Sequence, residues 1–412
     1  MHRGNDTMTD AGPDVPVDGS GAAVSTASAD RVPSPAVLLS LAAVAVAATA
    51  GWLFQWFFMW GYLGLAESDL VIFREAVRAV LDGVPLYSLR FDDVGGWTWP
   101  PFGALLMVPL TAIPDGLLMT LAYAVNAVCL AAVVWICSGP LRSWLAGTAP
   151  RLLAVGGLTL VALPLTPVAD VLGLGQIGLV LLLLCSFDIV VVARRAPSAY
   201  GVLVGIATAV KITPALFIVH FVVTRQWRAA VTATLTVVAC WSAAAVILWN
   251  DTVIYWSEGL LFRVNERIDH FGSGVFNQSW MGLVDGLPAP LPTPLWAALS
   301  TATLVVAFRA AVHAHRADDP VLVLGLVGLA SVLVTPVAWH HHAVWVVPAL
   351  LALLGDARTA WRVGAVAVVG SLLMVPSRLP TGGPDIFVVL YVVLGCCLLV
   401  LPHARRPTVH DG

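Results

Sequence analysis

A few polar residues stand out in this chain because each lies beside or within a long apolar segment. The first is Asp69, in the stretch Glu67-Ser68-Asp69. Apolar residues recur at helical spacing from Asp69 to Leu81, which predicts an amphipathic helix lying at a membrane interface. Ser68 or Asp69 could cap the N-terminus of that helix, or the Asp69 carboxylate could act as a general base. Arg74, on the same helix, is a candidate substrate ligand.

An aromatic loop follows this helix after Gly83. It contains Tyr87 and ends in the segment 97–102, which reads Trp-Thr-Trp-Pro-Pro-Phe. Aromatic rings beside two prolines form a stiff, apolar-faced platform on which a sugar can stack or an isoprenoid chain can pack. Tyr87 and Trp99 are therefore candidate substrate-binding residues, although aromatic side chains also serve as interfacial anchors.

Lys211 is the single lysine of the chain, and it lies inside the apolar stretch 199–223. Pro214 follows closely and forbids a regular helix at that point. A lone cation at membrane depth requires a counter-charge or a water-filled cavity, and an anionic lipid phosphate would suit it as a ligand. The alternative is that the long side chain reaches out to the membrane surface.

Three consecutive histidines, His340, His341 and His342, stand at the mouth of another apolar segment. Metal ligands on one helix need a spacing of three or four residues, so this run by itself predicts no metal site. We expect His341 or His342 to orient a carboxylate or to donate a hydrogen bond to a phosphate oxygen. The alternative is a pair of interfacial histidines without a chemical role.

Uncharged donors add to this set. Gln176 follows Gly175 in what resembles a helix-entry turn, and Asn277 and Gln278 lie together in a polar stretch. Each of these amides could hydrogen-bond a sugar hydroxyl, or it could merely satisfy backbone groups.

The elements that must position these residues are membrane helices. Of the 412 residues, 59% are hydrophobic and 11% charged, whereas a soluble domain carries roughly a quarter charged residues. The composition therefore excludes a soluble globular enzyme and predicts one all-α, polytopic membrane bundle. A formal net charge of −3 gives no basic surface for nucleic acid.

The segment 36–60 is long enough to cross a bilayer, which needs about 20 apolar residues. Further candidate spans lie at 116–138, 151–168, 174–193, 229–249, 293–312, 320–337, 339–354, 363–376 and 385–402. Arginines that flank these spans are expected in the cytoplasm. The arginines before and after 199–223 can both lie there only if this stretch enters and leaves the membrane on the same side. The stretch 100–113, entered through two prolines, is predicted to be re-entrant for the same reason. The count is then ten spans with two hairpins, or twelve spans.

This topology places both termini in the cytoplasm and the hydrophilic stretches 61–99 and 250–292 outside the plasma membrane. Residues 1–34 are polar and lack aromatic side chains, so we expect a disordered cytoplasmic tail. Residues 35–404 form the membrane domain, and 405–412 form a second cytoplasmic tail. Because the polar residues concentrate in the two outer stretches, we expect an extracytoplasmic active site.

In their order along the chain, these segments resemble a known family. The resemblance covers about residues 36–355 and includes Asp69–Phe73, Leu81–Tyr87, Trp99–Phe102, Gly175–Ile177, Ala209–Pro214, Asn277–Trp280 and Pro336–Trp345. The pattern is similar to the actinobacterial polyprenyl-phosphate-mannose-dependent α-1,2-mannosyltransferases of glycosyltransferase family 87, which have the GT-C fold. Their products are phosphatidylinositol mannosides and lipomannan.

The resemblance implies that Asp69 is the catalytic aspartate and that His341 and His342 are the family's paired histidines. It implies an inverting transfer of mannose from polyprenyl-phosphate-mannose to a mannosylated lipid, with no metal or other cofactor. Lys211 and a histidine would stabilise the departing phosphate. Three alternatives stay open, namely a polyprenyl-phosphate-pentose transferase of the same fold, a polytopic transporter and a membrane scaffold. The sequence leaves the acceptor and the oligomeric state undetermined.

Overall fold

The computed structural model describes residues 68–91, 95–142, 145, 147–259, 277–355, 360–374 and 386–401. Within these residues the chain is almost wholly helical, and its one sheet is a short ribbon of β1 (Arg90–Phe91) paired antiparallel with β2 (Gly95–Gly96). The predicted all-α class is confirmed. The predicted first span at 36–60 and both predicted tails lie outside the described residues.

Long apolar helices form the frame of the molecule. Among the described residues, three helices are long and apolar enough to cross a membrane: α4 (Asp115–Cys137), α12 (Trp227–Ile247) and α15 (Pro292–Arg316). The pair α6 (Thr148–Ala162) and α7 (Thr166–Leu174) also qualifies if its 80° bend is one broken span. Helices α4, α12 and α15 each fall on a span predicted from the sequence, because each of these segments is an unbroken apolar run.

The other helices that pack around these four elements are shorter. They are α5 (Gly139–Arg142), α8 (Gly178–Phe187), η4 (Asp188–Val192), α9 (Ala193–Arg195), α16 (Pro320–Val334), α17 (Val346–Leu354), α18 (Ala360–Leu372) and α19 (Ile386–Leu399). One predicted boundary is wrong, since α7 covers residues 169–173, which the prediction left between the spans 151–168 and 174–193. Pro164 ends the preceding helix, and Pro167 suits the first turn of a new one.

The stretch 199–223 folds as a helical hairpin, as predicted. Helix α10 (Val202–Val210) and helix α11 (Ala215–Val223) are separated by a break that begins at Lys211. The ring of Tyr200, before α10, packs against the ring of Phe221, near the end of α11, with their centroids 5.0 Å apart. The two ends of the hairpin are therefore together, and Lys211 lies at its tip.

The stretch 100–113 also turns back on itself, through α3 (Pro101–Met107) and η3 (Val108–Ala112). Both of its ends contact α2 (Asp69–Leu81). At one end, the ring centroids of Trp99 and Phe73 are 4.5 Å apart, and at the other, Arg78 donates a hydrogen bond to the Thr111 carbonyl at 3.2 Å. A methyl group on Gly103 would lie only 3.4 Å from the Val210 carbonyl oxygen. The two hairpins therefore meet beside Lys211.

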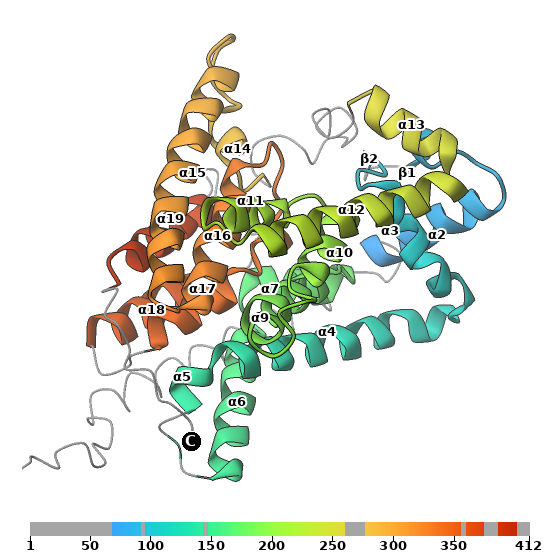
Figure 1. The fold of residues 1–412 in the computed structure, drawn as a ribbon. Coiled ribbons are helices and arrows are strands. Elements are labelled where there is room, and N and C mark those ends of the chain that lie inside the picture. The colour runs from blue at the N-terminus through green and yellow to red at the C-terminus, as the bar shows by residue number, and fades with distance from the viewer. Residues whose placement is uncertain are drawn as a thin grey trace, which may run out of the picture.

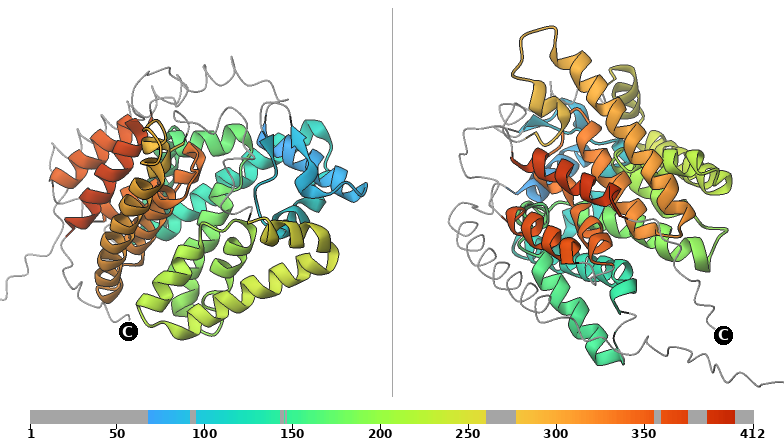
Figure 2. Two further views of the ribbon diagram at one scale, coloured as in Figure 1. Left: turned by 90° about the horizontal axis from the view of Figure 1, so that it is seen from above. Right: turned by 90° about the vertical axis from the view of Figure 1, so that its left-hand side faces the viewer.

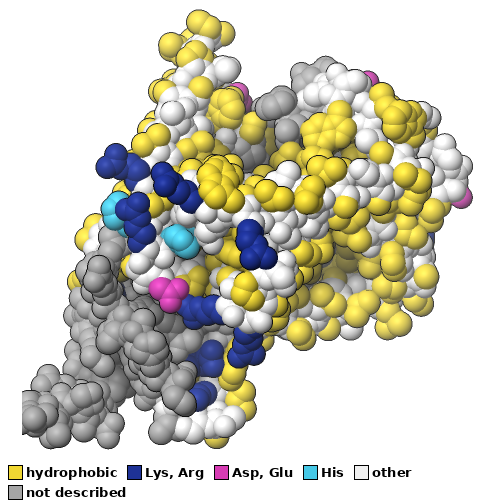
Figure 3. All heavy atoms as spheres, in the orientation of Figure 1, with side chains coloured by type: hydrophobic (Ala, Val, Ile, Leu, Met, Phe, Trp, Pro, Cys, Tyr) yellow, Lys and Arg dark blue, Asp and Glu magenta, His cyan; other side chains and the backbone are white. Residues whose placement is uncertain are grey.

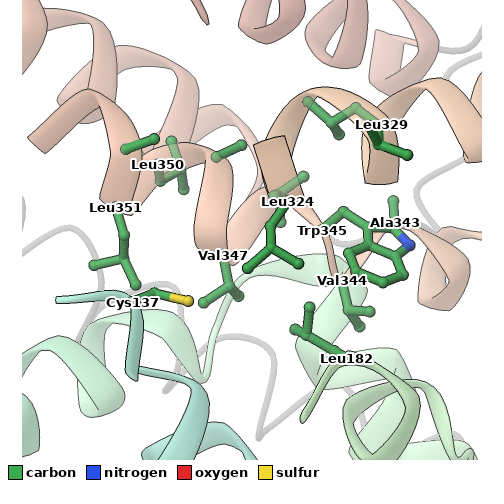
Figure 4. Packing of buried hydrophobic residues seen from close by; sticks show 14 of the residues in the cluster. Cys137, Leu182, Leu324, Leu329, Ala343, Val344, Trp345, Val347, Leu350 and Leu351 are labelled. Atoms are coloured by element: carbon green, nitrogen blue, oxygen red, sulfur yellow. The ribbon is translucent and has the colours of Figure 1, made fainter. Parts of the chain in front are cut away.

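Four short elements complete the described chain: η2 (Leu86–Ser88), α13 (Trp249–Ser257), α14 (Trp280–Val284) and η6 (His340–Ala343). Figures 1 and 2 show the arrangement, with α15 to α19 on one side, α2, α3 and α13 on the other, and α7 to α12 between them. The apolar core is densest where α16 and α17 pack together, and Figure 4 shows Leu324, Trp345 and Val347 meeting there.

Candidate active site

The predicted amphipathic helix is present as α2, with the predicted bounds Asp69–Leu81. Ser68 is its N-cap, and the Ser68 hydroxyl accepts a hydrogen bond from the Val71 N–H at 3.4 Å. The capping role is therefore filled by Ser68, and Asp69 is not needed for it. The Asp69 carboxylate instead accepts a hydrogen bond at Oδ2 from the Gln176 side-chain amide.

Gln176 reaches Asp69 because the chain turns sharply at Gly175. Gly175 ends α7 in the left-handed conformation, with a φ of 67°. A Cβ atom on Gly175 would lie only 2.7 Å from the Cβ of Leu70, so only glycine lets this turn approach α2 so closely. The turn thereby places the buried Gln176 side chain against the first turn of α2.

Lys211 lies where α10 ends, in extended backbone with a φ of −143° and a ψ of 127°. Its Nζ atom is 2.8 Å from the Nε2 atom of His342 and 5.2 Å from the ring centroid of Trp99. The Trp99 ring also packs against Phe73 of α2, the helix that begins at Asp69, so the Asp69 carboxylate is the candidate counter-charge for this lone cation.

The three histidines point in different directions. His342 contacts Lys211, and its Nδ1 accepts a hydrogen bond from the Trp339 N–H at 3.2 Å. A neutral His342 that accepts at Nδ1 carries its proton on Nε2, and it then donates that proton to the Lys211 nitrogen, so these two side chains share one hydrogen bond. His341 packs edge-on against His342, whereas His340 packs edge-on against Phe387 of α19, with their centroids 4.8 Å apart.

Asn277 holds the histidine segment in place. Its Nδ2 donates to the Pro336 carbonyl at 2.8 Å, and its Oδ1 accepts from the backbone N–H groups of Ala338 at 3.0 Å and Ser279 at 3.2 Å. The neighbouring Gln278 is fully buried, and its backbone N–H donates to the Ala338 carbonyl. Of the two roles considered for Asn277, satisfying backbone groups is the one that these contacts show.

The aromatic loop is buried and holds Trp99 in place. The Tyr87 hydroxyl and the Trp97 indole N–H both donate to the Trp99 carbonyl, at 2.7 and 2.8 Å. Asp251 of α13 anchors the start of this loop by accepting from the Leu86 N–H at 2.8 Å. Burial raises the pKa of Asp251, and its backbone hydrogen bonds oppose that shift. The Trp99 ring therefore faces Phe73 and Lys211, and the loop is packed inside the protein rather than open as a platform.

Arg74 lies apart from this group. Its side chain is buried, and it forms an ion pair with Asp115 at 2.8 Å and donates to the Ile113 carbonyl at 3.3 Å. A second contact, with Glu75, is 3.3 Å long. These contacts tie α2 to the start of α4, so the structure does not bring Arg74 together with Asp69 and Lys211.

The predicted residues that come together are therefore Asp69, Gln176, Lys211, His341, His342 and Trp99, from five separate parts of the chain. All five parts are places where a helix begins, ends or breaks. A model of one protein family matches residues 97–336, which include most of these places. The chain belongs to glycosyltransferase family 87.

This glycosyltransferase has named relatives in mycobacteria. It is 30% identical to a polyprenol-phosphate-mannose-dependent α-(1-2)-phosphatidylinositol mannoside mannosyltransferase of Mycobacterium tuberculosis, over 74% of this chain and 75% of the relative. A Mycolicibacterium smegmatis protein of the same name is 31% identical, over 71% of each chain. A phosphatidylinositol pentamannoside mannosyltransferase of the latter species is 28% identical over 89% of each chain. No solved structure matches significantly.

Two features of the glycosyltransferase site bear on its chemistry. Within the described residues, no group of three or more histidine, cysteine, aspartate or glutamate side chains is arranged to hold a metal ion. One polar neighbour of the site was not among the residues predicted from the sequence. It is Asn126 of α4, whose side-chain amide donates to the Gln176 carbonyl at 3.1 Å. A single asparagine inside an otherwise apolar span was the signal that could have revealed it.

Proposed function

We propose that the protein transfers a mannosyl residue from polyprenyl-phosphate-mannose to a hydroxyl of a mannosylated lipid, a phosphatidylinositol mannoside or lipomannan. The names of its mycobacterial relatives support the donor and the class of acceptor. The observation that carries the proposal is the position of Lys211 at the tip of a hairpin, beside His342 and beside Trp99, whose ring packs against α2. A lysine and a histidine together, near the helix that begins with a carboxylate, suit the transfer of a sugar from a lipid phosphate.

In the proposed reaction, Asp69 is the general base. Its carboxylate takes the proton of the acceptor hydroxyl while that oxygen attacks the anomeric carbon of the donor. The bond between the anomeric carbon and the phosphate oxygen breaks on the opposite face, so the configuration inverts. Gln176 donates to Asp69 at Oδ2, and this bond orients the carboxylate.

The leaving group is a phosphate, which is a stable anion and requires no general acid. The hydrogen-bonded pair of Lys211 and His342 would stabilise the negative charge that develops on the phosphate oxygens. His341, packed against His342, keeps that ring in its orientation. No step in this scheme uses a metal ion or another cofactor.

We place the reaction at the outer face of the plasma membrane. On the face seen in Figure 3, arginine side chains gather near α9, α15 and the start of α12. The arginines of α2 are instead paired with acidic side chains, Arg74 with Asp115 and Arg78 with Glu75. Arginines concentrate on the cytoplasmic side of membrane proteins. Helix α12 runs from Arg228 towards Trp249, so the α2 and α13 flank is the opposite, extracytoplasmic one.

The proposal is tested by incubating the purified protein in lipid vesicles with radiolabelled polyprenyl-phosphate-mannose and a series of phosphatidylinositol mannosides. We expect a radiolabelled product that carries one additional mannose in α-1,2 linkage, identified by nuclear magnetic resonance. A parallel reaction with a polyprenyl-phosphate-pentose serves as the control donor. Transfer from the pentose donor alone would contradict the proposed sugar, and transfer from neither donor would contradict the proposed reaction.

A further inference from the structure

Asn126 lies inside α4, the apolar helix that follows the α3 hairpin. Its side chain is 3% exposed, and its Nδ2 donates to the carbonyls of Gln176 and Ala122, each at 3.1 Å. Gln176 in turn donates from its side chain to Asp69. A continuous chain of hydrogen bonds therefore runs from the interior of α4, through the turn before α8, to the candidate base on α2.

The bond from Asn126 acts on the backbone of this turn. Gln176 lies two residues before the first residue of α8, so its carbonyl stands outside the hydrogen-bond ladder of that helix. This carbonyl accepts its hydrogen bond from the side-chain amide of Asn126. The N–H groups of Gly175 and Gln176 donate to carbonyls at the end of α7, at 3.1 and 2.9 Å, and the bond from Asn126 ties the same turn to α4. The position of the turn sets where the Gln176 amide meets Asp69.

A purely structural role does not explain an amide at this place. The Oδ1 atom of Asn126 and the Oε1 atom of Gln176 are both buried, and neither has a hydrogen-bond partner among the described residues. A buried acceptor without a partner lowers stability, whereas an apolar residue of the same size would cost nothing of that kind. The donor group of Asn126 is the part of the side chain that the structure uses.

We propose that Asn126 is a positioning residue, which sets the Asp69 carboxylate through Gln176. This proposal rests on the proposed function of Asp69 as the base. Asn126 touches neither Asp69 nor Lys211 in the contacts described above, so it acts on the reaction only through the turn at Gln176. Its removal should slow the chemical step and leave binding of the lipid-phosphate sugar unchanged, because the phosphate contacts come from Lys211 and His342.

A double-mutant cycle separates this role from a general effect on folding. The variants are Asn126→Leu, Gln176→Leu and the double variant, and the readouts are kcat and the KM for the donor. We expect Asn126→Leu to lower kcat by roughly tenfold to a hundredfold, the loss that a small displacement of a catalytic group produces. The donor KM should stay unchanged. The double variant should be no slower than Gln176→Leu, because both changes act on the same contact.

Ser138→Ala is the matched control. Ser138 directly follows α4, is fully buried and has a hydroxyl without a hydrogen-bond partner among the described residues, but it lies at the opposite end of the helix from Asp115. We expect this variant to keep wild-type kcat. If Asn126→Leu does not fold, Asn126→Ala replaces it, since alanine favours a helix, adds no charge and removes the N–H donor.

Three results would overturn the proposal: losses that multiply in the double variant, an unchanged kcat for Asn126→Leu or Asn126→Ala, or a donor KM that rises as kcat falls. The cycle needs only turnover of one lipid-phosphate sugar. If the wild type transfers a pentose instead of mannose, the proposed donor fails while the cycle still decides the role of Asn126.

Discussion

Residues 335–345 connect two regions of the molecule, the packed pair of helices α16 and α17 and the polar surroundings of Lys211. The two regions are held together in different ways. Between α16 and α17, glycines permit close contact. A Cβ atom on Gly325 would lie 2.9 Å from the Cα of Ala349, and one on Gly328 would collide with the Trp345 ring. Around Lys211, by contrast, helices end or break, and polar side chains join the ends.

This difference shows how one membrane bundle combines stability with chemistry. Small residues let apolar helices approach closely, and packing then fixes their positions without polar groups. A helix break at membrane depth leaves backbone groups that need partners, and each break therefore carries polar side chains with it. Trp345 lies three residues after His342, so the packed region holds the end of the segment that the polar region uses.

Removing the cation should break the polar region most severely. We expect Lys211→Met to weaken donor binding by roughly a hundredfold, because one charge-assisted hydrogen bond to a phosphate contributes about 1.5–3 kcal/mol. Acceptor binding should change little, and the protein should remain folded. The measurement is a donor titration with the purified variant, and Arg194→Met, an exposed arginine paired with Asp318, is the control. Equal donor affinity in the wild type and Lys211→Met would assign Lys211 a structural role.

The histidines beside Lys211 provide a second test of the polar region. Because the Nε2 of His342 lies 2.8 Å from the Nζ of Lys211, we expect His342→Ala to lower kcat/KM for the donor by about tenfold. His341 contacts the His342 ring edge-on, and His341→Ala should cause a smaller loss. Initial rates at low donor concentration measure both. A larger loss for His341→Ala would mean that the other ring faces the phosphate.

The packed region should respond through stability. We expect Gly328→Ala to lower the free energy of unfolding by about 1–3 kcal/mol, because the new methyl group collides with the Trp345 ring. Gly364→Ala in α18 is the control, since a methyl group there meets nothing within 4 Å and alanine favours a helix. Thermal unfolding in detergent measures both variants. Similar melting temperatures for the two would contradict the close packing of α16 and α17.

Much of the fold follows from the sequence for a simple reason. Unbroken apolar runs have few alternatives to a membrane helix, which is why α4, α12 and α15 fall where the sequence places them. The hairpin at Lys211 was also predictable, because a proline break and the positions of the arginines leave little choice. The boundary at α7 was not, since two nearby prolines could end a helix or start one.

The site was predicted less completely. Asp69, Lys211 and the histidines are recognisable because charged groups are rare in apolar segments. The directions of side chains are not readable in this way, so the sequence could not show that Arg74 faces Asp115 or that the Trp99 ring is buried. Asn126 meets Gln176 across 50 residues of sequence, and only the tertiary packing of α4 against the turn reveals that pair.

The central claim is that Asp69 removes the proton from the acceptor hydroxyl. The most direct test compares Asp69→Asn with the wild type, measuring donor binding at equilibrium and mannosyl transfer in a single turnover. Asp82→Asn, at the exposed far end of α2, is the matched control. We predict unchanged donor binding and a transfer rate lower by a factor of about 100 to 10,000 for Asp69→Asn alone. Transfer at the wild-type rate by Asp69→Asn would contradict the account.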